Sequence, residues 1–197
     1  GSLAFQANFR SAEDTTVYNG LFLMDSNGNA RPVASNRRVW TDLGGRPTFD
    51  ADGYGAGPSG EVYFTAYAGS KRVLYRQQGL EEPTKVIGAG DSFGGSTVNG
   101  FPSISLFWVS PEGDVVTAVT LANGQTRLLR IPNGNIADAE HVQISSWGAV
   151  WGARRGRGVL FGGTPTGKSW GLHLWKDGQW QTFYQTGSSK LGGGTIE

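Results

Sequence analysis

The chain has 197 residues, a net charge of +1, 32 glycines and no cysteine. The near-zero charge predicts no overall attraction to nucleic acid or to an acidic membrane surface, and the lack of cysteine excludes disulfides and thiolate metal sites. No apolar run approaches the roughly 18 residues that a membrane-spanning helix needs. Abundant glycine, together with 12% aromatic residues, is typical of many short strands joined by tight turns.

One hairpin pattern occurs four times along the chain. In its clearest copy, over residues 110–131, two apolar segments flank Asn123-Gly124, a dipeptide that readily takes the positive φ angles of a tight turn. Successive copies lie about fifty residues apart, which is the period of one four-stranded propeller blade. We therefore predict an all-β, β-propeller-like single domain, complete or part of a larger ring, with four blade-type repeats near residues 1–59, 60–112, 113–157 and 158–197.

Strands are predicted throughout, and no window keeps the apolar spacing of a helix. The first copy predicts strands at Leu3–Asn8, Leu21–Met24 and Pro32–Ala34. The second predicts strands at Val62–Ala66, Val73–Arg76, Lys85–Ile87 and Ile104–Val109. The third predicts Val115–Val119, Arg127–Ile131, His141–Ile144 and Ala149–Trp151, and the fourth predicts Val159–Phe161, Leu172–Trp175 and Gln181–Tyr184.

The segment Leu191–Ile196 resembles Phe93–Val98, the linker before the last strand of the second copy. The fourth copy reaches no fourth strand, and a bare strand edge is rarely left open in β proteins. We therefore expect the chain to be part of a longer repeat protein. Self-association with another chain is the second expectation.

Three parts of the chain combine a short Val- or Leu-containing strand with glycine-rich turns: Leu3–Phe5 with Gly20–Leu23, Ser59–Phe64 with Val86–Asp91, and Ser110–Thr117. This pattern resembles a family of bacterial tandem repeats named for an Asn-x-x-Gly-x-x-x-Ala-Phe signature. Here Gly57 and Ser110 stand in place of the signature asparagine, and the fourth copy has drifted further. The resemblance implies a repeat scaffold of exported, anchored proteins, at an extracellular or cell-surface location, without catalytic residues.

Residues Gly162–Ser169 match the phosphate-loop pattern G-x-x-x-x-G-K-[ST]. A phosphate loop needs backbone amides at the start of a helix, whereas an alternating strand follows here. We therefore predict a hairpin connection without nucleotide affinity. Two G-x-S-x-G matches, at Gly90–Gly94 and Gly167–Gly171, lack the strand-to-helix turn of a hydrolase nucleophile. The two histidines, His141 and His173, lie in different copies without a carboxylate at ligand spacing and make only a weak case for zinc. His173 is expected to be solvated or hydrogen-bonded.

Two acidic segments have the oxygen density that calcium prefers, and calcium is the one metal ion that the sequence suggests. Their residues are also those of ordinary hairpin turns, which is the favoured interpretation. The same side chains define an alternative hypothesis, a propeller-type glycan hydrolase or lyase with Asp50, Asp52 or Asp91 as acids, for which two carboxylates must converge. The candidate calcium ligands are Asp25, Asn27, Asp50 and Asp52.

Six of the seven tryptophans lie in the second half of the chain. Some of these belong in the core, but half-exposed indoles beside turns often mark a binding surface, on which sugar rings stack. The basic run at 154–157 is interpreted as a solvated loop rather than a nucleic-acid site. We predict a non-catalytic extracellular binding or surface-structural module that recognises carbohydrate or a cell-surface protein. Its candidate ligand-binding residues are Trp147, Trp151, Trp170, Trp175, Trp180, Arg154 and Arg155.

Overall fold

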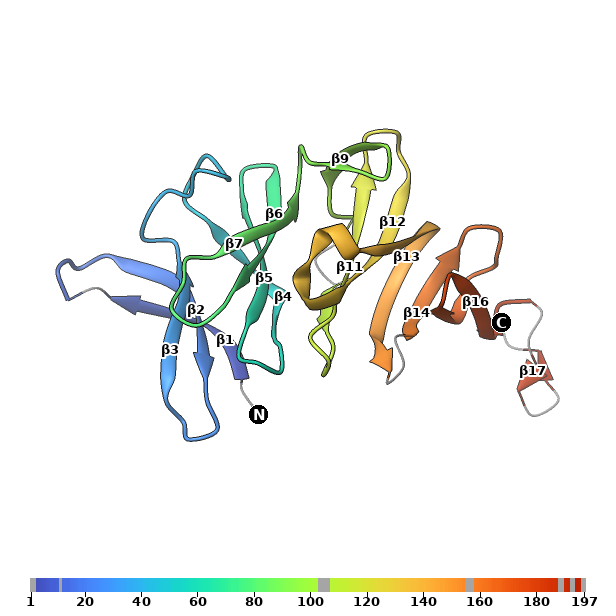
Figure 1. Cartoon of the computed structure of the whole chain (residues 1–197), viewed down its shortest axis with the longest axis horizontal. Helices are drawn as coiled ribbons and strands as arrows, with labels where there is room; N and C mark the ends of the chain where they lie inside the picture. Colours follow the sequence, from blue (N-terminus) through green and yellow to red (C-terminus); the bar gives the residue numbers. More distant parts are fainter. Residues whose placement is uncertain are drawn as a thin grey trace.

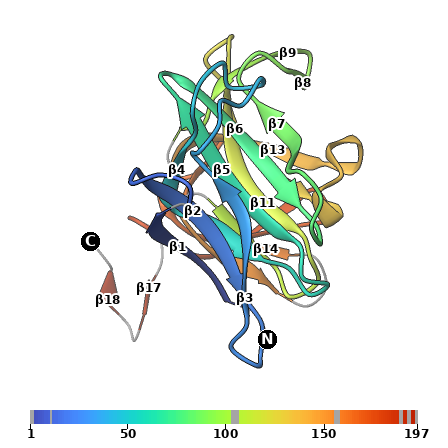
Figure 2. The same cartoon turned by 90° about the vertical axis from the view of Figure 1, so that its left-hand side faces the viewer.

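The computed structural model describes residues 3–10, 12–102, 107–154, 158–187, 190–191 and 194–195, and gives backbone only for 51–52, 107, 147–154, 190–191 and 194–195. The strands form antiparallel sheets that follow one another along the long axis of the molecule (Figure 1). Seen from one end, the sheets lie behind one another (Figure 2). The predicted all-β fold is confirmed, and no sheet closes on itself within the described residues. None of the described segments forms a helix long and apolar enough to cross a membrane.

The strands group into four units in chain order. The first sheet contains β1 (Leu3–Arg10), β2 (Val17–Met24) and β3 (Ala30–Ser35). The second sheet contains β4 (Thr48–Ala56), β5 (Val62–Ala68), β6 (Lys71–Gln77) and β7 (Thr84–Gly88). The third unit contains β10 (Phe107–Val109), β11 (Val115–Leu121), β12 (Thr126–Ile131) and the start of β13 (Glu140–Arg154). The fourth unit contains the rest of β13, β14 (Gly158–Pro165), β15 (Gly171–Lys176) and β16 (Gln179–Gln185).

The four predicted hairpins are present, and their strands pair in the same register. In each hairpin, the first residue of the leading strand (in β14 the second) pairs with the last or second-to-last residue of the following strand. Because the register is shared, positions in the four hairpins can be equated one by one. The pairs are Leu3 with Met24, Val62 with Gln77, Val115 with Ile131, and Val159 with Trp175.

The second sheet and the third unit use the same turn to enter their hairpins. In Gly57–Glu61 and in Ser110–Asp114, the N–H of the first residue donates to the carbonyl of the fifth at 2.8 Å. Proline is the second residue of both turns, and glycine the fourth, with φ of 79° at Gly60 and 93° at Gly113. Side chains rarely adopt these φ values, so glycine is required at the fourth position.

The third and fourth units share a strand, which corrects the prediction of two separate strands in this part of the chain. Residues 140–144 of β13 pair with β12, and residues 144–154 pair with β14. Register shifts follow Ile144, Ser146 and Val150, and irregularities of this kind bend and twist a strand. The two predicted strands His141–Ile144 and Ala149–Trp151 are therefore parts of one continuous strand that leaves one unit for the next.

The acidic passage around Asp50–Gly53 is a second correction, because it lies within β4 rather than in a turn. The pairing of β4 with β5 shifts register between Phe49 and Tyr54, so the intervening residues form an irregular stretch. Aspartate and glycine disfavour strands by themselves. Tertiary contacts compensate, since Phe49 and Asp50 are both buried.

Two short hairpins confirm the similarity between the linker near residue 93 and the segment near residue 191. In the first, β8 (Ser92–Phe93) pairs with β9 (Ser96–Gly100); in the second, β17 (Lys190–Leu191) pairs with β18 (Gly194–Thr195). Residues 192–193 and 196–197 lie outside the described part. The remaining regular segments are two single 3₁₀ turns, η1 (Pro132–Gly134) and η2 (Ile136–Asp138).

The core consists of three clusters, one between each pair of successive units. Alternation along a strand sends neighbouring side chains to opposite faces. On β5, for example, Val62 and Phe64 pack in the cluster with the first sheet, whereas Tyr63 packs in the cluster with the third unit. The third cluster joins Val116 and Leu128 to the fourth unit.

Candidate functional site

A polar cleft of about 510 Å³ lies where the second sheet meets the third unit. One wall comes from the β5–β6 hairpin, and the other comes from the end of β9 and from β11. This volume lies within the range of small-molecule sites. The lining residues are Tyr67, Gly69, Ser70, Arg72, Asn99, Gly100, Phe101 and Thr120.

Arg72 is the fixed cationic group of this cleft. Its Nη2 donates to Oδ1 of Asp50 at 3.1 Å, and its Nε lies 3.0 Å from Oδ2 of the same carboxylate. The guanidinium carbon lies 5.3 Å from the centre of the Tyr67 ring, within the distance of a cation–π contact. Arginine has five N–H donors, so the two contacts with Asp50 leave donors available at a side chain that is 25% exposed.

Asp50 is the buried partner that fixes the position of Arg72. The aspartate is 5% exposed and also accepts a hydrogen bond from Oγ1 of Thr65 at 2.7 Å. A buried carboxylate needs such partners because an unpaired buried charge is strongly destabilising. The pair is neutral overall, so the cleft presents oriented N–H donors without a net positive charge.

The chemistry of the lining suits a neutral, hydroxyl-rich ligand. Ser70, Asn99 and Thr120 supply hydroxyl and amide groups, while Tyr67 and Phe101 supply aromatic surface. Sugars are recognised by this combination of polar groups and apolar ring faces. A second cavity, of about 490 Å³ beside β3, is lined more by apolar side chains and is bridged by the Arg38–Glu82 ion pair.

The structure does not gather the predicted tryptophans into one surface. Trp175 is 4% exposed and belongs to the core, and half-buried Trp180 lies beside it with ring centres 6.3 Å apart. Trp170 is 47% exposed and contacts Tyr184 edge-to-face. None of these three lines the cleft. The side chains of Trp147, Trp151 and Arg154, and the whole of Arg155, lie outside the described part.

The predicted calcium ligands lie in different places. Asp25 closes the β2–β3 turn, where its carboxylate accepts the N–H groups of Asn27 and Asn29 at 2.8 and 2.9 Å. These hydrogen bonds lower the pKa of Asp25, with those from Asn29 the largest cause. Asp50 is engaged by Arg72, and the side chain of Asp52 is not described. Among the described residues, no three His, Asp or Glu side chains are grouped to hold a metal, and calcium stays a prediction.

Two carboxylates of the alternative enzymatic hypothesis, those of Asp50 and Asp91, are likewise engaged. Asp91 contacts Nζ of Lys85 at 2.5 Å and accepts the N–H of Gly88 at 2.8 Å. Asp50 is bound by Arg72 and Thr65 as described. Neither lines the cleft, and the described residues show no convergence of these two side chains on a common cavity.

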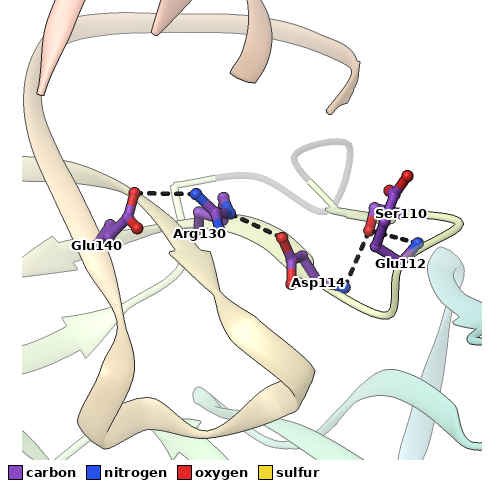
Figure 3. A network of polar contacts seen from close by, with 5 residues as sticks. All are labelled: Ser110, Glu112, Asp114, Arg130 and Glu140. Atoms are coloured by element: carbon purple, nitrogen blue, oxygen red, sulfur yellow. Dashed lines mark hydrogen bonds and ion pairs between the residues drawn. The ribbon is translucent and has the colours of Figure 1, made fainter. Parts of the chain in front are cut away.

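A second ionic network, around Arg130, has a structural position (Figure 3). Arg130 is 2% exposed; its Nε lies 2.8 Å from Oδ2 of Asp114 and its Nη1 lies 3.0 Å from Oε2 of Glu140. Oγ of Ser110 accepts the N–H groups of Glu112 and Asp114. The network ties the turn before β11 to β12 and β13.

The phosphate-loop match is a hairpin connection, as predicted. β14 and β15 are antiparallel, and the N–H of Lys168 donates to the carbonyl of Pro165 at 3.0 Å in the turn between them. His173 is fully buried; its Nδ1 lies 3.1 Å from Oγ1 of Thr182 and its Nε2 lies 3.3 Å from the carbonyl of Ser169. A neutral ring with its proton on Nε2 satisfies both contacts. The predicted lack of nucleotide affinity stays a prediction.

Sequence reasoning missed the cleft. Its residues are scattered over a hairpin, a linker and the end of β11, and they match no spacing motif. The available signal was polar: Arg72 directly precedes the buried residues Val73, Leu74 and Tyr75 of β6. Comparison with known proteins adds no identification, since no family model, curated protein or solved structure matches the chain.

Proposed function

We propose that this chain is a non-catalytic, propeller-like repeat module that binds a neutral carbohydrate in the cleft beside Arg72. The observation that carries the proposal is a neutralised, immobilised guanidinium that is flanked by aromatic and hydroxyl side chains. A phosphate-rich ligand is disfavoured because Asp50 cancels the charge of Arg72.

Two observations support the propeller-like arrangement: first strands of successive units lie side by side, and the hairpins share one register. β4 and β10 are the first strands of their units, and β10 lies next to both β4 and β13. Adjacent first strands, with hairpins fanning outward in a common register, are what blades around an axis require. We also propose an extracellular location, which rests on the resemblance to exported tandem repeats alone.

The ligand proposal is tested by binding of neutral and acidic oligosaccharides to the whole chain by calorimetry. Asn99→Ala and Tyr67→Ala should each weaken binding of a neutral oligosaccharide about tenfold or more, since each removes a polar or stacking contact. Trp170→Ala is the matched control at an exposed aromatic outside the cleft. Binding that survives both cleft variants, but is lost in Trp170→Ala, would transfer the site to the fourth unit. Binding of no neutral sugar would refute the proposal.

A further inference from the structure

The two ends of the row of sheets carry apolar faces that belong to none of the three core clusters. The first outer face consists of Leu3, Phe5, Phe22 and Met24, and the last outer face consists of Leu160, Leu172 and Leu174. Leu3 is 55% exposed, and the other six side chains are half-buried. These faces lie at opposite ends of the molecule, on β1–β2 and on β14–β15 (Figure 1).

The first outer face is equivalent to faces that are buried in every later unit. By register, Leu3 corresponds to Val62, Val115 and Val159. All three valines are 0% exposed and pack in the cluster with the preceding unit. The first sheet therefore carries the surface with which a unit receives the unit before it.

An aromatic pair repeats this equivalence in detail. Phe5 and Phe22 are cross-strand partners, with ring centres 5.6 Å apart and ring planes at 21°. Phe64 and Tyr75, the equivalent partners in the second sheet, show the same 5.6 Å and 21°. The second pair is 0% and 1% exposed in the cluster with the first sheet, whereas the first pair is only half-buried.

The last outer face is the complementary surface. Leu160 corresponds to Tyr63 and Val116, and Leu172 corresponds to Leu74 and Leu128. The four equivalents are 0% exposed and pack in the cluster with the following unit. A hollow of about 300 Å³ beside Leu174 on the β15–β16 hairpin adds a recess to this end.

We propose that the first outer face of one copy of this chain docks on the last outer face of a second copy, head to tail. The contact continues the series of three internal interfaces. In each of these, the face of one unit that points to the next unit packs against the face of that next unit that points back. It is heterologous, so two such contacts close a ring of two copies if the rotation permits. Eight units fall within the range of blade numbers that propellers use. The proposal does not depend on whether the cleft binds sugar.

Sedimentation of the whole chain over a wide concentration range tests the contact. The unmodified chain should associate reversibly into a species of two copies. Leu3→Glu and Leu174→Glu should each weaken association about a hundredfold or more, because each buries an unpaired carboxylate in the contact. Val39→Glu is the control. Val39 lies between β3 and β4, is 62% exposed and is outside both faces, so this substitution should leave association unchanged. Far-ultraviolet circular dichroism checks that each variant is folded.

Mixing the two interface variants decides the geometry. The Leu3→Glu chain keeps an intact last face, and the Leu174→Glu chain keeps an intact first face. An equimolar mixture should therefore form a heterodimer through one contact, although neither variant associates alone. A chain that stays monomeric at every concentration overturns the proposal. Association that survives one variant alone, with no gain on mixing, overturns the head-to-tail arrangement in favour of contacts between like faces.

Discussion

At the scale of single residues, several buried ionisable groups of this chain serve the fold through specific partners. Asp50 holds Arg72, Arg130 holds Asp114, and His173 joins the β14–β15 turn to β16 through its two ring nitrogens. A charge inside a protein is tolerated only when it is paired and hydrogen-bonded. Asp50 and His173, which suggest acid–base chemistry in the sequence, are thereby committed to contacts within the chain.

Removing Arg130 should be costly because the Asp114 carboxylate would remain buried without its cation. We expect Arg130→Leu to lower the free energy of unfolding by about 3–5 kcal/mol, measured by urea denaturation. The double variant Arg130→Leu/Asp114→Asn should recover part of this loss, since the asparagine carries no charge. A loss below about 1 kcal/mol in the single variant would contradict a structural role for the pair.

His173 should make stability depend on pH. Burial, the largest cause, lowers the pKa of His173 below its ordinary 6.5. Below that pH the unfolded chain therefore binds a proton that the folded chain does not, so this contribution to stability is present above pH 6.5 and is lost as the pH falls through the folded-state pKa.

The check is urea denaturation between pH 7.5 and 5 (roughly the window in which histidine titrates), with His173→Gln expected to flatten the fall in stability. His141→Gln is the comparison. Desolvation and then the charge of Arg127 lower the pKa of His141 as well, but this histidine is exposed whereas His173 is fully buried. An unchanged slope in His173→Gln would contradict the prediction.

At the scale of elements, repeated turns and register shifts give the strands their places. The turns at Gly57–Glu61 and Ser110–Asp114 direct two hairpins identically, and the shifts in β13 let one strand serve two units. Close backbone approach is used where β15 meets β16. A side chain at Gly171 would place its Cβ 2.0 Å from the carbonyl oxygen of Tyr184.

Gly171→Ala should therefore disrupt the pairing of β15 with β16. We expect a loss of about 1–3 kcal/mol in the free energy of unfolding, since backbone atoms block the new methyl group. Gly100→Ala is the matched control, because a Cβ there meets no atom within 4 Å, and it should change stability by less than about 0.5 kcal/mol. Equal effects of the two substitutions would show that the close contact between Gly171 and the backbone of Tyr184 does not exclude a side chain.

At the scale of the whole molecule, stability comes from packing between units rather than from any single sheet. Each unit has two apolar faces, and the three clusters bury one face of each end unit and both faces of the middle units. Units that contact only their neighbours gain stability from each interface that is added.

This organisation predicts that thermal stability rises with protein concentration. Association that involves only the folded state stabilises it by mass action. The midpoint of thermal unfolding should increase from dilute to concentrated solution in the unmodified chain and stay constant in Leu3→Glu, as measured by calorimetry. A midpoint independent of concentration in both chains would argue against the end-to-end contact.

The sequence by itself determined the local architecture. Alternating apolar residues and Asn-Gly or similar turns predicted the hairpins at Val62, Val115 and Val159, since pleating and turn geometry depend on neighbouring residues alone. For the same reason the match at Gly162–Ser169 was correctly predicted to connect strands.

Only the tertiary structure decided what depends on contacts between distant segments. The passage at Asp50–Gly53 is a strand because Asp50 meets Thr65 and Arg72, which lie 15 and 22 residues further along the chain. β13 joins two units because of register shifts that no local pattern encodes. The cleft exists because a hairpin, a linker and the end of β11 meet, and burial against the core removes Trp175 from any surface. These outcomes depend on packing and charge pairing between residues that are far apart in the sequence. Local sequence patterns do not show which distant residues will meet in the fold.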